Sequence, residues 1–287
     1  MNRLLVLLLL SGLSALSGTP VLAVLTCTIA SAGWSTVYND TVGTNNTPSA
    51  SLTVTCQRSA GGDPTTVSYT VRVDNGVNAA AAQNRARLGA GANLINYENH
   101  RNGSCSALWG NTAATDIQGT ITFTNNGDFS SRNQLQPFWG CVPPLQTAKP
   151  AGVYTDLVTM TLRRGGTILN TSAFPATIIV PATCSFPTAP GTVAFTYTAF
   201  QAGASNASTG FQVRCNNQLP YSLSVGAATE VVGGLQYSLA ISPLGPYSGT
   251  GFAQPFTING TMPGGQAGTC GAGNCLATQP RTLTVTY

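Results

Sequence analysis

The chain has 287 residues with a formal net charge of +4 at pH 7, and only 7% of them are Asp, Glu, Lys or Arg, far below the usual quarter. Apolar residues make up 43%, enough for two buried cores, so the composition excludes a disordered chain and indicates a β-rich extracellular protein. The densest basic spots are Arg85 with Arg87 and Arg163 with Arg164, which excludes the basic stripe of a nucleic-acid-binding protein.

Residues 1–23 have the pattern of a secretory signal peptide. A short basic start is followed by a continuous apolar run at residues 4–10 and by an expected cleavage site after Ala23. The alternative is a membrane anchor, but the apolar run is too short to span a bilayer, and no later segment is long enough. We therefore expect an exported protein without a membrane span, whose mature chain begins at Val24.

Eight cysteines follow this leader: Cys27, Cys56, Cys105, Cys141, Cys184, Cys215, Cys270 and Cys275. An even number in an exported chain predicts disulfides. There is no Cys-x-x-Cys pair and His100 is the only histidine, so we expect no metal and no cofactor. Four cysteines in one half allow three connectivities, and spacing alone does not decide between them. The internal repeat favours the pairs Cys27–Cys56, Cys105–Cys141, Cys184–Cys215 and Cys270–Cys275.

The two halves of the mature chain repeat one pattern of short strands. The expected strands lie at residues 51–56, 67–73 and 156–162 in the first half, and at residues 210–215, 221–225 and 281–287 in the second. They alternate polar and apolar residues and are bounded by Gly, Asn, Asp and Pro, whereas no long stretch keeps helical spacing. This pattern predicts an all-β fold with one β-sandwich in each half. The expected domains are residues 24–165 and 183–287, joined by residues 166–182.

Three passages of the first half resemble the spore coat protein U domain family, which includes the subunits of archaic (Csu-type) chaperone–usher pili. They are residues 94–97 followed by Leu108-Trp109-Gly110, residues 138–143 with Gln146, and residues 152–156 with the strand after them. The second half fits by its cysteine pair and its final Leu-Thr-Val-Thr-Tyr. It lacks a Trp-Gly, and residues 277–281 replace the family's Gly-x-Tyr-x-Asp.

The resemblance implies two immunoglobulin-like, pilin-type β-sandwich domains, of which the C-terminal one lacks its last strand. In such pilins a periplasmic pilus chaperone, and later the N-terminal extension of the adjacent pilin subunit, supplies the missing strand by pairing with the open sheet edge. The implied partners therefore also include an outer-membrane usher. The implied location is a fimbria at the cell surface, reached through the periplasm.

The sequence departs from a shaft pilin at its beginning. Cleavage after Ala23 leaves three residues before Cys27, too few to fill a groove that needs about five strand residues. We therefore expect a subunit that can accept a strand but not donate one, which places it at the end of a fibre. Residues 166–182 are either a linker or a donor strand that completes the first sandwich in cis, since tethering makes its effective concentration high. The residues of that strand are Phe174, Ala176, Ile178 and Val180.

These expectations predict a pilus tip adhesin that mediates attachment to an abiotic or host surface and biofilm formation. The alternatives are a structural coat or cell-surface protein without a ligand, and a secreted carbohydrate-binding module. We expect no enzyme, because the chain has no Gly-x-Ser-x-Gly, no His-Glu-x-x-His and no phosphate-binding glycine loop. Trp109 and Trp139 are expected in the core. The candidate adhesive loops are residues 36–50, 79–92 and 111–136, with Leu88, Ile117, Phe129 and Leu135 as possible contact residues.

Overall fold

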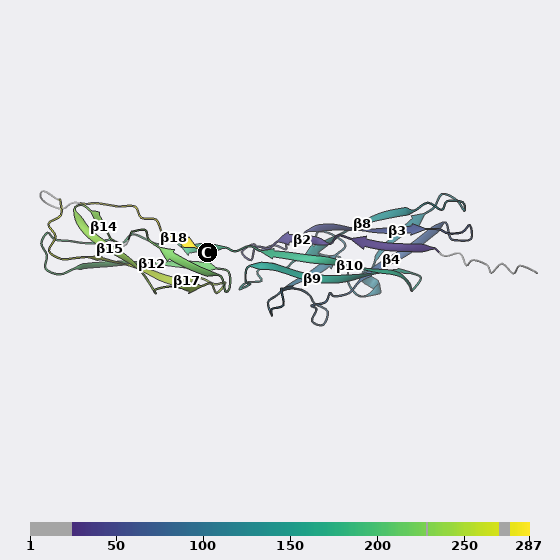
Figure 1. Ribbon diagram of the computed structural model, residues 1–287, viewed down its shortest axis with the longest axis horizontal. Coiled ribbons are helices and arrows are strands. Elements are labelled where there is room, and N and C mark those ends of the chain that lie inside the picture. The colour runs from purple at the N-terminus through teal and green to yellow at the C-terminus, as the bar shows by residue number, and fades with distance from the viewer. Residues whose placement is uncertain (1–24, 228, 270–275) are drawn as a thin grey trace, which may run out of the picture.

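The computed structural model describes residues 25–227, 229–269 and 276–287. Within them the chain consists of strands and loops, with one short 3₁₀ helix at Ala113–Thr115. Figure 1 shows two groups of strands lying end to end, the first half of the chain on the right and the second on the left. The expected leader, Cys270 and Cys275 lie outside the described residues. The prediction of an all-β fold is confirmed.

The first sandwich contains ten strands, which follow one another along the chain. They are β1 (Thr26–Ser31), β2 (Trp34–Val37), β3 (Ser49–Gln57), β4 (Thr66–Val73), β5 (Asn84–Leu88), β6 (Leu94–His100), β7 (Ile117–Thr122), β8 (Arg132–Cys141), β9 (Gly152–Arg164) and β10 (Thr167–Val180). One layer has the order β1-β3-β8-β6, and the other has the order β7-β4-β9-β10-β2. β5 pairs with both β6 and β9 and so joins the layers along one side.

Alternation along the strands produces the core of this sandwich. In β4 the side chains of Val67, Tyr69, Val71 and Val73 are buried, whereas Thr66 and Ser68 are exposed. Successive side chains of a strand point to opposite faces, so this pattern directs one face of each layer inward. Trp109, predicted to be in the core, is buried, whereas Trp139 is half-buried.

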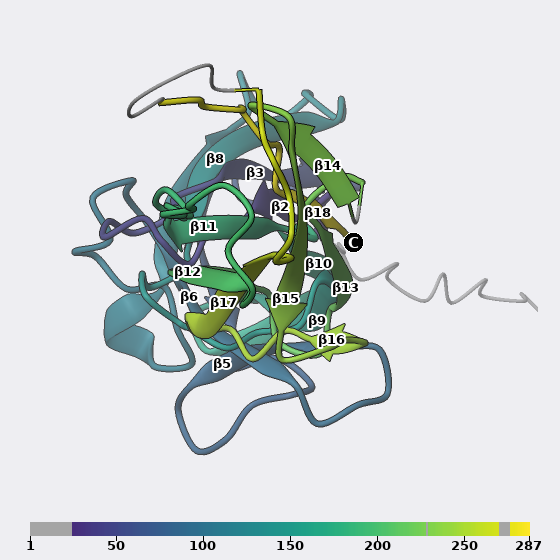
Figure 2. The same cartoon turned by 90° about the vertical axis from the view of Figure 1, so that its left-hand side faces the viewer.

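The described part of the second sandwich contains eight strands. They are β11 (Cys184–Thr188), β12 (Ser205–Cys215), β13 (Pro220–Ser224), β14 (Thr229–Val232), β15 (Leu235–Ser242), β16 (Tyr247–Ser248), β17 (Gln254–Met262) and β18 (Thr284–Thr286). One sheet has the order β11-β12-β17-β15-β14, and the other has the order β16-β13-β18. Figure 2 looks onto this sandwich along the long axis of the molecule.

Three disulfides connect the described cysteines: Cys27–Cys56, Cys105–Cys141 and Cys184–Cys215. Two of them join directly paired residues at equivalent places, because the first links β1 to β3 and the third links β11 to β12. The repeated cysteine spacing in the sequence therefore corresponds to a repeated pair of strands. The expected pair Cys270–Cys275 lies outside the described residues.

Candidate strand-accepting groove and exposed surfaces

The last strand of the first sandwich is β10, which lies between β9 and β2. It pairs antiparallel with β9 along its length and parallel with β2 at residues 176–179. The hairpin turn from β9 to β10 consists of Gly165 and Gly166, with φ of +53° and +89°. Glycine adopts such positive φ angles without the strain that other residues suffer. The turn therefore allows β9 to be followed at once by a neighbouring strand.

The four residues expected on the inner face of this strand are all in the core. Phe174, Ala176 and Ile178 are 0% exposed, and Val180 is 5% exposed. The Phe174 ring lies 6.0 Å from the Trp109 ring and 5.1 Å from the Phe138 ring. Full burial of a Phe or Ile side chain stabilises a fold by about 1.5–3 kcal/mol. Residues 167–180 are thus a structural strand of the first sandwich rather than a plain linker.

The second sandwich repeats the first strand by strand, except for β10 and the short strand β2 beside it. The order β11-β12-β17-β15-β14 corresponds to β1-β3-β8-β6-β5, and β16-β13-β18 corresponds to β7-β4-β9. No strand among the described residues corresponds to β10. Residues 189–198, which follow β11 as β2 follows β1, form no strand either. The layer therefore has a gap at the position that β10 occupies in the first sandwich.

Tyr237 on β15 lies between the two segments that border the position of the missing strand. It is 5% exposed, and its ring lies 6.0 Å from the ring of Phe195 on one flank. On the other flank its hydroxyl donates to Oε1 of Gln279 at 2.8 Å. Residues 191–198 and 277–287 thus flank the same tyrosine. We call the position between these two segments, where no described strand pairs, the acceptor groove.

Apolar side chains line both flanks of the acceptor groove. Val193 and Phe195 are half-buried on one flank, and Leu283 and Val285 are half-buried on the other. The first flank is seated on β17 at Gly260, where an added Cβ would come within 2.5 Å of Phe195. In each flank the half-buried residues alternate with exposed ones, which is the pattern of an extended strand with one face toward the core.

The main chain of residues 191–198 pairs with no strand. Gly191 N donates to Oγ1 of Thr209 at 3.0 Å and Thr198 N donates to Oε1 of Gln201 at 2.9 Å. The carbonyl oxygens of Thr196 and Thr198 accept from Ser205 Oγ at 2.8 Å and from Gln201 N at 3.0 Å. β18 pairs with β13 alone. A sheet edge with free N–H and C=O groups is a template for an added strand. The two flanks therefore combine half-buried apolar side chains with unpaired backbone.

The second half departs from the Gly-x-Tyr-x-Asp pattern at the group that contacts a buried tyrosine. In the first sandwich the Tyr97 hydroxyl donates to Oδ2 of Asp156 at 2.8 Å, and burial raises the pKa of both groups. In the second sandwich Arg281 replaces the acid and forms an ion pair with Glu230 at 3.0 Å. Its guanidinium also donates to the carbonyl oxygens of Val225 and Ala227 at 2.9 and 2.7 Å. Arg281 thus fixes the second flank to the loop after β13.

The structure separates the four candidate adhesive residues into different environments. Ile117 is 5% exposed and belongs to the core, so its prediction as a surface contact is wrong: it is the first inward-facing residue of β7. Leu88 is half-buried and packs on the core beside Gly152. Phe129 and Leu135 are 43% and 65% exposed. The structure therefore leaves these last two as free surface side chains.

The first candidate adhesive loop, residues 36–50, lies against the second sandwich. The Asp40 carboxylate accepts a hydrogen bond from the Arg214 guanidinium at 2.6 Å. Arg214 also donates through Nε to the carbonyl oxygen of Gly251 at 2.8 Å. This loop is therefore part of the contact between the sandwiches and does not lie at the free end of the molecule.

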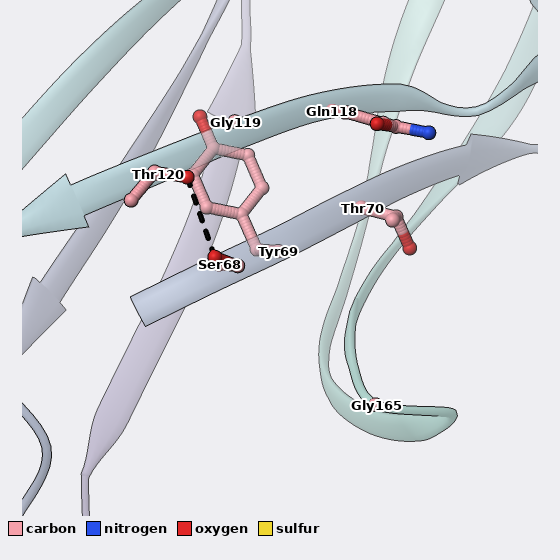
Figure 3. Close-up of a pocket in the computed structure, with 7 residues that line it drawn as sticks. All are labelled: Ser68, Tyr69, Thr70, Gln118, Gly119, Thr120 and Gly165. Carbon is pink, nitrogen blue, oxygen red and sulfur yellow. Dashed lines mark hydrogen bonds between the residues drawn. The ribbon is translucent and has the colours of Figure 1, made fainter. Parts of the chain in front are cut away.

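A shallow hollow of about 470 Å³ lies on the outer face of β4 and β7 (Figure 3). It is lined by Ser68, Tyr69, Thr70, Gln118, Gly119, Thr120 and Gly165. Tyr69 crosses Gly119 so closely that a Cβ there would come within 2.3 Å of its ring, and its hydroxyl donates to Oε1 of Gln134 at 2.7 Å. Apart from glycine, the residues that line the hollow carry hydroxyl groups and one amide.

Two further properties hold for the residues that the structure describes. None of their helices is long and apolar enough to cross a membrane. They also include no group of three or more His, Cys, Asp and Glu side chains that could hold a metal ion.

The family model described as Spore Coat Protein U domain matches residues 15–161 and 170–240. No curated protein matches the sequence. Among solved structures, the CupB6 tip adhesin from Pseudomonas aeruginosa is 10% identical, with 92% of this chain and 95% of that chain covered and a TM-score of 0.41. The chaperone–tip adhesin complex of CFA/I fimbriae is 11% identical, with 76% and 84% covered and a TM-score of 0.33. Both TM-scores are below 0.5, so the likeness is distant.

Proposed function

Since the chain belongs to the spore coat protein U domain family, we propose that it is the tip subunit of an archaic chaperone–usher pilus and attaches the fibre to a surface. The observation that supports this proposal is the difference between the two sandwiches. The first contains its own last strand, β10, whereas no described strand occupies the same position in the second. Such a molecule needs one partner strand, at its second sandwich.

The acceptor groove suits a strand that alternates apolar and polar side chains. Residues 191–198 extend over about 26 Å at 3.3 Å per residue, room for a strand of about eight residues. By analogy with β10, the guest would run antiparallel to β18 and parallel to residues 191–198. Its inward side chains would pack against the half-buried Phe195 and Leu283, while its backbone would pair with both edges.

We propose a periplasmic pilus chaperone as the first donor of this strand and the adjacent pilin subunit as the second, with an outer-membrane usher between the two steps. The expected mature start at Val24 supplies no strand to a further subunit, so the protein would end the fibre. N-terminal sequencing of the exported protein tests this point. A mature chain that begins at Val24 supports the tip position. A mature chain that begins well upstream and retains a long alternating strand contradicts it.

A strand added in cis provides the sharpest test of the acceptor groove. The chain would be extended after Tyr287 by Gly-Gly and the sequence of residues 167–180, which reproduces the hairpin between β9 and β10. We expect this extension to give a monomer that binds less hydrophobic dye and no longer co-purifies with the chaperone.

The matched control carries the same extension with serine at the four inward positions, equivalent to Phe174, Ala176, Ile178 and Val180. It has the same length and the same backbone donors, but it cannot fill the apolar pockets. We expect the control to behave like the unextended chain. The proposal is wrong if the unextended chain is already a stable monomer with little dye binding and the apolar extension changes nothing.

Surface attachment and a role in biofilm formation are the second part of the proposal, and they are assigned to the first sandwich. A variant that lacks residues 25–180 retains the acceptor groove and should still enter fibres. We expect such fibres to lose attachment to plastic and host surfaces. Fibres of the variant that attach as well as wild-type fibres would favour a structural coat protein instead.

A further inference from the structure

Two loops form the end of the first sandwich that is remote from the second (Figure 1). Residues 58–65 join β3 to β4, and residues 123–131 join β7 to β8. β3 begins at Ser49, near the loop whose Asp40 contacts the second sandwich, and ends at Gln57, about 27 Å away at 3.4 Å per residue. We call residues 58–65 and 123–131 the distal loops.

A buried arginine holds the distal loops together. Arg58 is only 1% exposed although it carries a full charge. Its guanidinium donates at 2.6–3.3 Å to the carbonyl oxygens of Ala60, Gly61, Asp63 and Asn125. The first three acceptors lie in one loop and the fourth lies in the other. The flat guanidinium carries five N–H donors in a fixed fork, so a single side chain can fix both loops at once.

The charge of Arg58 is compensated nearby by Asp63, which is 5% exposed. The Asp63 carboxylate accepts hydrogen bonds from the backbone N–H groups of Ser59 and Ala60 at 2.8 and 3.0 Å. The Ser59 N–H is the main cause that keeps the pKa of this carboxyl below its ordinary value, and the positive Arg58 adds to it. A buried charge that is paired and hydrogen-bonded is tolerated, whereas an isolated one is not.

Arg58 also sets the position of an aromatic side chain at the surface. The Phe129 ring lies 5.8 Å from Arg58 Cζ, and the buried Phe123 ring lies 5.7 Å from the same atom. A guanidinium within about 6 Å of a ring is attracted by the ring's quadrupole. Gln57 adds a hydrogen bond from Nε2 to the carbonyl oxygen of Phe129 at 3.2 Å. Phe129 itself remains 43% exposed, so its ring is held on one side and free on the other.

Each charged side chain of the distal loops is buried or paired. Arg58 and Asp63 are buried, and Asp128, the other charged residue of the distal loops, forms an ion pair with Arg132 at 2.7 Å. The remaining side chains of the loops are uncharged. A surface of this kind fits a partner bound by apolar contact and hydrogen bonds, and its binding should change little with salt.

We infer that Arg58 is a positioning residue that fixes the distal loops so that Phe129 contacts an apolar surface. The inference rests on the proposed adhesive function and specifies the contact residue and the chemistry of the surface for that function. Phe129 is the contact, and Arg58 acts through it. Loss of Arg58 should therefore matter for attachment only while Phe129 is present.

The test compares fibres that carry the full-length chain as wild type, F129A, R58K, Q57A and the double variant R58K/F129A. Lysine retains the charge and the apolar stem, but its three donors radiate from one atom and cannot reach both loops. Gln57 is exposed, so Q57A weakens the support of Phe129 without a risk to folding. Attachment is measured on polystyrene and on clean glass at low and high salt, and hydrogen exchange is followed along the chain.

We expect F129A and R58K to reduce attachment to polystyrene by a similar factor, about tenfold, and Q57A to reduce it by less. The double variant should be no worse than F129A alone. In R58K, exchange should rise in both distal loops and stay unchanged in β10 and in the second sandwich. Attachment of the wild type should change less than twofold with salt.

Several outcomes would overturn the inference. One is unchanged exchange in the distal loops of R58K. Another is a double variant that loses far more attachment than F129A, because Arg58 would then act independently of Phe129. A wild type that prefers glass and is released by salt would assign the surface to polar or charged partners. A wild type that attaches to neither material refutes the proposed adhesive function itself, whereas full attachment by R58K beside a defective F129A refutes the role of Arg58 alone.

Discussion

Truncation of Phe174 to alanine tests whether β10 is an integral part of the first sandwich. Its side chain is fully buried and lies against the rings of Trp109 and Phe138. Truncation of a buried phenylalanine costs about 3–5 kcal/mol, because the apolar transfer energy is lost and a cavity remains. Contact with two rings on a rigid sheet leaves little room for collapse, so we expect a value in the upper half of this range. The free energy of unfolding should fall by about 4–5 kcal/mol.

Tryptophan fluorescence provides an assay that reports on this sandwich alone. The three tryptophans, Trp34, Trp109 and Trp139, all lie in the first half of the chain. Urea unfolding followed at this signal gives the stability of the first sandwich from the midpoint and the slope. The matched control is T171A, an exposed residue on the same strand, for which we expect a change within about 0.5 kcal/mol.

The result that would refute this reasoning is a loss of less than about 1 kcal/mol in F174A with an unchanged slope. Such a result would mean that β10 can leave the sheet without unfolding of the rest. The strand would then be a docked linker, and the first sandwich would also be open to a strand from another chain. An equal loss in T171A would mean that pairing along β10, rather than burial of Phe174, holds the strand.

Three further predictions concern other parts of the molecule. Replacement of both Cys105 and Cys141 by serine should lower the free energy of unfolding of the first sandwich by about 4 kcal/mol, because the unfolded chain regains the entropy of a loop of 36 residues. Urea unfolding followed by tryptophan fluorescence measures this loss. I117A should lower the free energy of unfolding by about 2–5 kcal/mol, whereas L135A should change it by less than about 0.5 kcal/mol. Urea unfolding of both variants measures this, and a larger loss in L135A than in I117A would contradict the burial pattern. The pKa of Asp128 lies below its ordinary value, chiefly because the Ser130 hydroxyl donates a hydrogen bond to its carboxylate. Protection of residues 123–131 from hydrogen exchange should therefore be complete above about pH 4 and should be lost as the pH falls through the lowered pKa. The variant D128N should remove this pH dependence.

Much of the fold could be predicted from the sequence because strands carry a local signal. Alternation placed the strand at 174–180 and gave the correct inward face, from Phe174 to Val180. Ile117 shows the limit of such a signal. It stands directly after a loop, and whether the first residue of a strand faces inward depends on its register with β4, where it pairs with Val71. That register depends on two segments about 46 positions apart and cannot be predicted from either segment alone.

The role of Arg58 was missed for a related physical reason. Arginine is almost always exposed, so a single arginine before a Ser-Ala-Gly-Gly loop indicates a solvated turn. Its burial becomes favourable only because Asn125, from a distant loop, offers a carbonyl oxygen at 2.7 Å and because Asp63 lies beside it. The acceptor groove could be anticipated only through the family resemblance. Its geometry depends on Tyr237, which touches both flanks.

The comparison of β9 with β18 suggests what a guest strand would do to the second sandwich. β9 forms a strand over Gly152–Arg164 with neighbours on both sides, whereas its counterpart forms a strand only at Thr284–Thr286. Residues 276–283 differ from β9 in having no backbone partner among the described residues, and a strand paired on one short edge is marginal. Arg281 nevertheless fixes this segment beside β14, through its ion pair with Glu230. A guest in the acceptor groove would therefore pair with a segment already in place and extend β18 toward residue 277. Assembly into the fibre would then complete the fold of the second sandwich as well as cover its apolar groove.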